Sequence, residues 1–348
     1  MLSAALLVLA LQVLAAALLV ITVVATARKG QTHRTLARDA ARTDAVRPFV
    51  VALVSGEQPP WPPGALGAQA ERLAVETLRK VRGEARDALA AALEARGSID
   101  RAIRRARRPG ALGRARAADL LGLARVERAL PDLVRLLGDR SPVVRRVAAR
   151  AIGTLGLAEG AAPLLAATHR RRALPAGIVA MAIEQIGPSC ATTLRSALHD
   201  PSATARLVAA QLLGHHEVLA SAGDVVGRME VEPQPVVRAT MARSLGAIGS
   251  PVAVPALREL VAGWDPPAVR AAAAEALGRI GAVDAVPLLV EALEEGGYEV
   301  PHAASRALHD LGIDGRAALV AAVQRGESGA AHAAEALALG VVREVGRR

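Results

Sequence analysis

The sequence predicts an all-α protein, a solenoid of stacked helical pairs preceded by one transmembrane helix. Three observations predict it: the composition, a repeat with a period of about 31 residues, and an uncharged N-terminal segment. Of the 348 residues, 52% are hydrophobic but only 1% are aromatic. Alanine, leucine, valine and isoleucine must therefore build the core. Regularly spaced glycines and prolines favour many short, closely packed helices over a sheet.

The repeat is clearest in two stretches, VVRATMARSLGAIGSPVAVPALRELV from Val236 and AVRAAAAEALGRIGAVDAVPLLVEAL from Ala268. Glycine is expected where a helix ends in a left-handed conformation or where two backbones approach closely. Such glycines recur at the end of the first helix, as Gly153 with Gly156, Gly246 with Gly249, Gly278 with Gly281, and Gly187 and Gly312 alone. A proline then fits the first turn of the second helix, at Pro131, Pro163, Pro255 and Pro287. Because one pair cannot bury both of its apolar faces, neighbouring pairs must stack.

These units share an acidic residue, an arginine five or six positions later, the pattern R-x-x-A-x-x-A-(L/I)-G-x-(L/I)-G and a P-x-L run. This pattern resembles the HEAT repeat, in the short form named after phycobilisome lyases, from roughly Gly83 to Val342. The resemblance implies a right-handed α-solenoid of about eight helical pairs, with the second helices lining the concave surface.

The same resemblance implies that the acid before the first helix and the arginine within it register adjacent repeats. The matching residues are Asp139 with Arg145, Asp200 with Arg206, Glu232 with Arg238, and Asp265 with Arg270. Arginine and carboxylate suit such a ladder because their two planar groups form paired hydrogen bonds. Two copies carry Ala176 and Pro301 in place of the arginine, so we expect less regular packing near them.

The segment from Leu2 to Ala27 carries no charge. About 25 residues at 1.5 Å each exceed the ~30 Å of a bilayer's hydrocarbon core, which predicts a transmembrane helix over 1–27. Basic residues follow at once, namely Arg28, Lys29, Arg34 and Arg38. The positive-inside rule then predicts a single-pass inner- or plasma-membrane protein with its N-terminus outside and its solenoid in the cytoplasm. A cleaved signal peptide is the alternative, but no basic residue precedes the apolar run.

The sequence divides into three regions. The transmembrane helix covers 1–27 and a basic juxtamembrane segment begins at 28 and runs to 65. We expect that segment to contain a short capping helix over 43–57 and a stiff proline-rich loop at Pro59 to Gly64. The solenoid covers 66–345.

A net charge of +10 predicts attraction to acidic surfaces. The candidate interaction ridge consists of arginines spaced at i, i+3, i+4 and i+7 on one helix, together with a second basic group, and its members are Arg101, Arg104, Arg105, Arg108, Arg170, Arg171 and Arg172. An acidic partner or lipid headgroups would bind such a ridge. A solvated helix face is the alternative.

No arrangement of residues in the sequence indicates catalysis. His215-His216-Glu217 is a single His–Glu pair, whereas the HEAT-like deoxyhypusine hydroxylases hold iron with such pairs from several repeats. The other histidines of the repeats show no metal spacing, and Cys190 is most simply a small buried residue. With two Trp, one Tyr and one Phe, the chain offers little base stacking, so nucleic acid is disfavoured as a partner.

These observations predict a membrane-anchored, non-catalytic scaffold or adaptor that needs no cofactor. Its groove would bind a protein partner, such as an integral membrane enzyme, and its N-terminal helix would contact membrane lipids. One alternative is a chromophore or cofactor lyase subunit or another HEAT-like enzyme, as the resemblance implies. A nucleic-acid-binding protein is a further alternative.

Overall fold

The computed structural model describes residues 40–169, 171–326 and 328–345. In these ranges the chain forms α-helices and short 3-10 helices and no strand, which confirms the predicted all-α class. The chain divides into two compact units, Met1–Arg101 and Ala102–Arg348. The predicted transmembrane helix and the basic residues just after it lie outside the described residues. Within the described ranges, no helix is both long and apolar enough to cross a bilayer.

The first unit contains a helix over 40–54, α2 (Gly64–Leu78), α3 (Glu84–Ala95) and the start of α4 (Ser98–Ala106). The proline-rich loop between the first two helices is held by its tryptophan. The Trp61 ring packs edge-on against Phe49, with 4.9 Å between the ring centroids. The guanidinium of Arg96 lies 4.4 Å from the centre of the same tryptophan. These aromatic and cation–π contacts fix the loop on the helices beside it.

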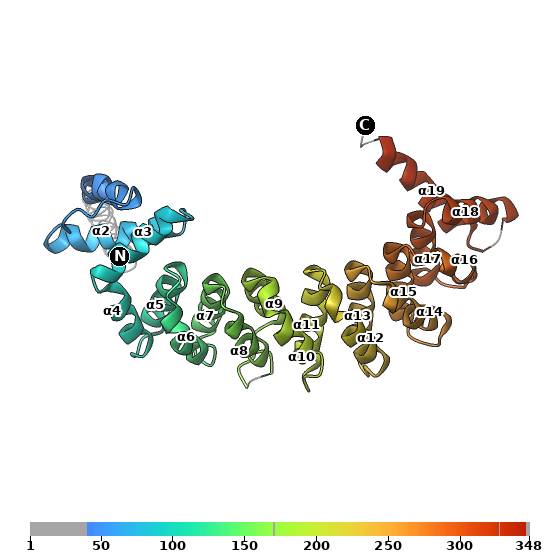
Figure 1. The fold of residues 1–348 in the computed structure, drawn as a ribbon, viewed down its shortest axis with the longest axis horizontal. Coiled ribbons are helices and arrows are strands. Elements are labelled where there is room, and N and C mark those ends of the chain that lie inside the picture. The colour runs from blue at the N-terminus through green and yellow to red at the C-terminus, as the bar shows by residue number, and fades with distance from the viewer. Residues whose placement is uncertain (1–39, 170, 327, 346–348) are drawn as a thin grey trace, which may run out of the picture. The chain divides into compact units, whose positions relative to one another are not determined.

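The second unit consists of helical pairs that follow one another in chain order (Figure 1). The first helices of the pairs are α5 (Ala111–Leu123), α7 (Pro142–Leu155), α9 (Ala176–Ile186), α11 (Ala203–His215), α13 (Pro235–Ile248), α15 (Pro267–Ile280) and α17 (Glu299–Asp310). The second helices are α6 (Leu130–Leu136), α8 (Ala161–Ala166), α10 (Ala191–Ala197), α12 (Ala222–Glu230), α14 (Val254–Ala262), α16 (Val286–Leu293) and α18 (Ile313–Arg325). A last helix, α19 (Ala330–Val345), packs against α17 and α18.

The predicted glycine and proline positions mark the ends of these helices. Gly249 ends α13 in the left-handed conformation, with a φ of 72°, and Gly281 ends α15 in the same way. Prolines stand in the first two positions of α6, α14 and α16, where the missing N–H costs no helical hydrogen bond. The sequence prediction of where one helix stops and the next begins is therefore confirmed.

A second set of glycines brings successive first helices close together. A Cβ built on Gly246 would lie 2.7 Å from the Cα of Ala276, and one on Gly278 would lie 2.6 Å from the Cα of Ala307. No side chain fits in that space, so glycine on one helix must face a small residue on the next. The same contact recurs at Gly122, Gly153 and Gly214. The predicted close approach of backbones is confirmed at these positions.

One junction lacks this contact. At the position equivalent to Gly153, α9 carries Glu184, and at the position equivalent to the facing alanine, α11 carries Leu212. These two helices pack less extensively than the other successive first helices. The carboxylate of Glu184 instead lies 3.2 Å from Nε2 of His215. This is the repeat in which Ala176 stands in place of the arginine of the pattern, and its packing is less regular, as expected. The repeat with Pro301 in that place packs closely against the preceding first helix, with Gly278 facing Ala307.

The core has the composition that the sequence requires. Among the described residues, the buried hydrophobic side chains are alanine, leucine, valine, isoleucine, two methionines and Cys190, and none is aromatic. Burial raises the pKa of the Cys190 thiol, because a thiolate would lose its hydration there. The structural role predicted for this cysteine agrees with its position.

The ladder arginines join one repeat to the next. Arg206 forms two hydrogen bonds to Glu232, of 2.7 and 2.8 Å. Arg238 bonds to Asp265 and Arg270 bonds to Glu295. Each of these arginines thus pairs with the acid of the following repeat. Within its own repeat, Arg206 donates to the carbonyl of Asp200 at 2.9 Å. Arg238 donates instead to the carbonyls of Met229 and Glu230, and Arg270 to that of Val261.

The ladder is interrupted after Arg145. This arginine donates to the carbonyl oxygens of Asp139 and Arg140, and its buried Nε has no partner among the described residues. The corresponding turn of the following repeat contains Arg171 and Arg172 and no acid. Because the next repeat also lacks its arginine, Asp200 has no ladder partner from the preceding repeat. Because the turn after α8 offers no acid, Arg145 has no carboxylate partner there, and Arg171 and Arg172 add positive charge to that turn.

Replacing Gly246 with alanine should destabilise the repeats. The added Cβ would overlap the α15 backbone. Overpacking of this kind lowers the free energy of unfolding by about 1–3 kcal/mol. The measurement is thermal unfolding of the full-length chain, followed by circular dichroism. Gly227, inside α12, is the control, because nothing lies within 4 Å of a Cβ built there. Gly227→Ala should raise the melting temperature slightly, and a Gly246→Ala variant at least as stable would contradict the packing described above.

Replacing Glu232 with glutamine should lower the free energy of unfolding by about 3–5 kcal/mol. The change removes the negative charge that pairs with buried Arg206 and with its neighbour Arg228. Burial alone would raise the pKa of Glu232, but hydrogen bonds from Arg206, the N–H of Gln234 and Arg228 outweigh it and hold the pKa below its usual value near 4.5. This stabilisation is therefore complete above about pH 4.5 and is lost as the pH falls through the lowered pKa.

Urea unfolding between pH 3 and pH 7 tests both the loss of stability in Glu232→Gln and its dependence on pH. The glutamine variant should be less stable at pH 7 and should lose less of its stability on acidification than the parent protein. Exposed Glu259, changed to glutamine, is the control and should alter neither quantity. Equal pH dependence in parent and Glu232→Gln would show that this carboxylate does not stabilise the ladder.

A candidate anion-binding site lined by arginines

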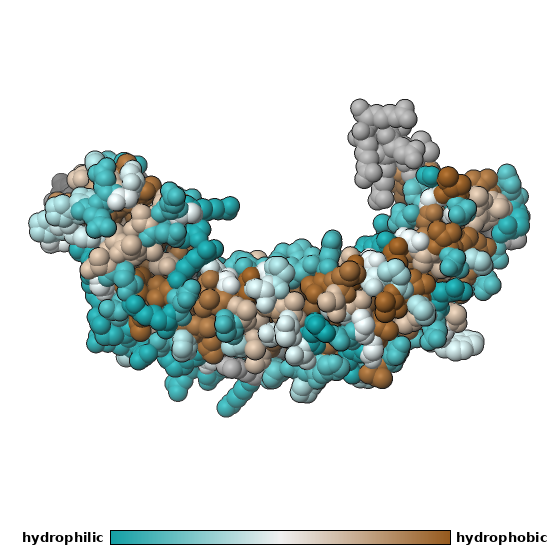
Figure 2. Space-filling view, in the orientation of Figure 1, coloured by the Kyte–Doolittle hydropathy of each residue, from teal (hydrophilic) through white to brown (hydrophobic). Residues whose placement is uncertain are grey.

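Three turns between successive repeats border an open hollow of about 560 Å³ on the surface of the second unit. The turns follow α4, α6 and α8. They lie along the lower edge of the view in Figure 2, where the surface is mostly hydrophilic. We name it the arginine hollow, after the six arginines that line it: Arg107, Arg108, Arg114, Arg135, Arg140 and Arg172. Asp139 is the one acidic residue in its lining.

Local sequence explains why the arginines point outward. Ala102 and Ala106 of α4 are buried, so the charged side chains between and after them face solvent. The helix ends at Ala106, and Pro109 followed by Gly110, with a φ of 101°, turns the chain into α5. The residues just before that turn are therefore displayed at the rim of the hollow.

Two of the arginines are paired with buried carboxylates. Arg107 forms hydrogen bonds of 2.8 and 2.9 Å to the two oxygens of Asp132, and Arg114 binds Asp139 at 2.7 and 2.9 Å. The bond from Arg107 holds the pKa of Asp132 below its usual range despite burial. Burial would raise the pKa of Asp139, but the bond from Arg114 and one from the N–H of Ser141 outweigh it and lower that pKa. Both acids therefore remain ionised at neutral pH.

The other arginines leave an excess of positive charge. Arg135 donates to the carbonyl of Ala106 and lies 3.5 Å from the already paired Asp132. In the described part of the chain, the side chains of Arg108, Arg140 and Arg172 have no acidic partner, and all three are exposed. Six arginines face two carboxylates, so the formal excess is four positive charges. Guanidinium groups with free N–H bonds bind carboxylates and phosphates in a paired geometry, which makes the hollow a candidate anion site.

The family is shown by the pattern of the repeats. The pattern of HEAT repeats matches residues 99–184, 191–266, 225–309 and 264–340, more than half of the chain. The chain belongs to the HEAT-repeat family. No curated protein matches it in sequence.

Solved structures resemble this HEAT-repeat protein at low sequence identity. The karyopherin Kap121p is 12% identical over 80% of this chain, with a TM-score of 0.52, and the chain spans 35% of its length. Human deoxyhypusine hydroxylase is 23% identical, covering 78% of this chain and 97% of its own, with a TM-score of 0.33. The CpcE–CpcF complex of phycocyanin lyase from Nostoc is 21% identical, covering 62% and 88%, with a TM-score of 0.31. The similarity to Kap121p shows the fold alone.

Three arginines of the predicted interaction ridge, Arg101, Arg104 and Arg105, lie on α4 and have different surroundings. Arg101 belongs to the first unit, where it bonds to Glu71 at 3.0 Å. Arg104 is exposed on α4, and the guanidinium of Arg105 lies against Gly113, where a Cβ would be 2.3 Å from its Nε. Because α4 ends at Ala106, the helical spacing does not extend to Arg108.

The two basic groups that are distant in sequence meet in the hollow. Arg108 and Arg172 line the same cavity, while Arg171 is exposed nearby in sequence and Arg170 lies outside the described residues. The residue spacing on single helices did not predict Arg135 or Arg140. The signal that could have found Arg140 is its place in the turn between repeats, which corresponds to the turn that carries Arg108.

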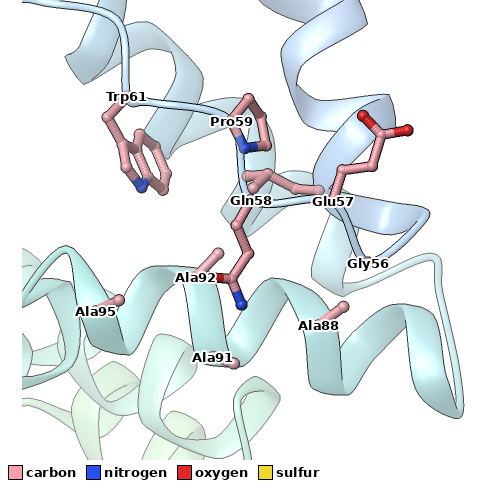
Figure 3. Close-up of a pocket in the computed structure, with 10 residues that line it drawn as sticks. Gly56, Glu57, Gln58, Pro59, Trp61, Ala88, Ala91, Ala92 and Ala95 are labelled. Carbon is pink, nitrogen blue, oxygen red and sulfur yellow. The ribbon is translucent and has the colours of Figure 1, made fainter.

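Two other cavities lack the excess of positive charge that the arginine hollow has. One of about 790 Å³ beside α14 and the turn after α15 contains one basic residue, Arg258, and two acidic residues, Glu259 and Asp284. One of about 250 Å³ in the first unit lies between the proline-rich loop and α3 (Figure 3). There Gln58 points toward the alanines of α3, whereas the carboxylate of Glu57 points away from them. Neither cavity gathers charge of one sign.

Charge reversal in the hollow should spare the fold. Because Arg108, Arg140 and Arg172 have no acidic partners, changing all three to glutamate should leave the melting temperature of the HEAT-repeat protein unchanged or slightly higher. Arg114→Glu should lower it, because Asp139 would then face a like charge. Thermal unfolding monitored by circular dichroism compares the two variants. A triple variant less stable than Arg114→Glu would show that the three arginines hold the repeats together.

Proposed function

We propose that this protein is a non-catalytic scaffold or adaptor, which binds an acidic segment of a protein partner in the arginine hollow. The formal excess of four positive charges in one hollow supports the proposal most directly. Charges of one sign in a recess raise the local concentration of oppositely charged ligands and speed their association. Exposed Arg108, Arg140 and Arg172 would make the direct contacts.

The size of the hollow favours a peptide segment. A volume of about 560 Å³ exceeds what one small anion fills, and the unpaired guanidinium groups come from three different turns. Carboxylates spaced along a peptide could contact several of these turns together, each through paired hydrogen bonds. A membrane enzyme with an acidic cytoplasmic segment is the kind of partner that we propose.

A binding role fits the chemistry of the lining better than catalysis does. Arginine stays protonated at any physiological pH, so the six arginines act as fixed charges and do not transfer protons. The one lining carboxylate, Asp139, is held ionised by Arg114. The buried Cys190 thiol has a raised pKa, which disfavours the reactive thiolate. These properties support a scaffold over an enzyme.

Membrane attachment is part of the proposal and rests on the sequence. The uncharged run from Leu2 to Ala27 supports a single transmembrane helix in contact with lipid. The basic residues from Arg28 to Arg38 support an N-terminus outside and the repeats in the cytoplasm, at the inner or plasma membrane. Attachment would confine the repeats to the membrane surface, where the effective concentration of a membrane partner is high.

Capture of the partner tests the proposal. The full-length protein, carrying an affinity tag, is expressed in its own host, solubilised from membranes with detergent and purified after nuclease treatment. We expect it to sediment with membranes and to retain a protein partner that the Arg108→Glu, Arg140→Glu, Arg172→Glu variant loses by about tenfold or more. Raising the salt concentration should weaken the parent complex, because the contacts are ionic and exposed.

A matched variant separates the hollow from general charge. Arg243, Arg279 and Arg306 are exposed on first helices and form no ion pair in the described structure. Changing them to glutamate alters the net charge equally and should leave the partner bound. Equal capture by both triple variants would refute the hollow as the binding site. A coloured eluate would favour the lyase alternative, and binding that nuclease removes would favour nucleic acid.

A further inference from the structure

Three potential metal ligands converge near the C-terminal end of the second unit. His302 lies on α17, and His332 and Glu335 lie on α19. One nitrogen of each histidine and one carboxylate oxygen all lie within 4.8 Å of one another. The cluster is far from the arginine hollow in the chain and shares no residue with it.

The arrangement follows from the packing of two helices. His332 and Glu335 are three residues apart, so they occupy the same face of α19. That helix packs against α17, which presents His302. Tyr298, at the start of α17, stacks on the His302 ring with 5.1 Å between centroids and meets the His332 ring edge-on at 5.3 Å. The tyrosine therefore orients both imidazoles.

One atom of the cluster lacks the partner that its burial requires. Nδ1 of His302 is buried and has no hydrogen-bond partner in the described structure. The nearest carboxylate oxygen, on Glu335, lies 3.9 Å away, too far for a hydrogen bond. Buried polar atoms without partners are rare in folded proteins and call for an explanation. A cation between the two groups would supply the partner to both.

We propose that His302, His332 and Glu335 form a binding site for a divalent transition metal, with zinc as the best-fitting ion. Two imidazole nitrogens and one carboxylate oxygen are ligands that zinc prefers. Tetrahedral zinc with bonds of about 2.0–2.1 Å places its ligands about 3.3 Å apart. The three side chains reach that spacing by moving together about 1–1.5 Å, and a water molecule completes the fourth position.

A metal in this site would join α19 to α17. The two helices belong to different pairs, and α19 has no following repeat in the described structure to cover it. A ligand that binds only the folded arrangement stabilises it, by an amount that grows with metal concentration. The site would thus fasten α19 to α17, independently of what the arginine hollow binds.

Metal titration of the full-length chain tests the site. The protein is purified without a histidine tag, treated with chelator and titrated with zinc in competition with a chromophoric chelator. We expect one equivalent to bind and the melting temperature to rise. Cobalt should give the visible absorption of a tetrahedral site. Changing His302 and His332 to glutamine should weaken zinc binding by at least about tenfold, since losing ligands costs no less than losing an outer-shell group.

Two further variants make the result decisive. Glu335→Gln should also weaken zinc binding and remove the rise in melting temperature, while its metal-free melting temperature and helicity match those of the parent. His215→Gln with His216→Gln removes two histidines elsewhere and should bind zinc as the parent does. No binding at micromolar zinc, or equal loss in this control, would refute the site. A shift in stability with pH but not with zinc would leave only an ion pair between His302 and Glu335, and would refute it too.

Discussion

The close approach of successive first helices is the constraint on which the rest of the structure depends. At Gly246 and Gly278 a helix backbone comes so near the next helix that a single Cβ would overlap it. This spacing explains a core of alanine and aliphatic side chains without buried aromatic rings among the described residues, since larger groups would separate the helices. The exception is informative. Where Glu184 and Leu212 replace the small residues, the two helices pack less extensively.

The same spacing sets the positions of the charges. Each turn between repeats lies beside the next, so that an arginine near the start of one first helix reaches the acid of the following turn, as Arg206 reaches Glu232. Where the following turn contains arginines instead, the charge stays uncompensated. Arg145 loses its acidic partner in this way, and Arg172 joins Arg108 and Arg140 in the hollow. The candidate anion site is therefore an interruption of the ladder that stabilises the other repeats.

The two proposed sites differ in what they require of the fold. The arginine hollow depends on charge in exposed turns. The charges of Arg108, Arg140 and Arg172 can be reversed by substitution without removing an ion pair. The histidine and glutamate cluster depends on the docking of α19 against α17, because its ligands come from two helices. One site would bind a partner, and the other would fasten α19 to α17. Their tests are independent for this reason.

The sequence by itself determined the all-α class, the ends of the helices and the aliphatic core, because glycine, proline and apolar spacing act through local geometry. It also located the basic groups at Arg108 and Arg172. Only the tertiary structure decided that these groups share a hollow, that Arg206 pairs with Glu232 and that His302 meets Glu335. Each of these contacts joins residues about 25 or more positions apart, and their distance depends on how one repeat stacks on another, which local patterns do not specify.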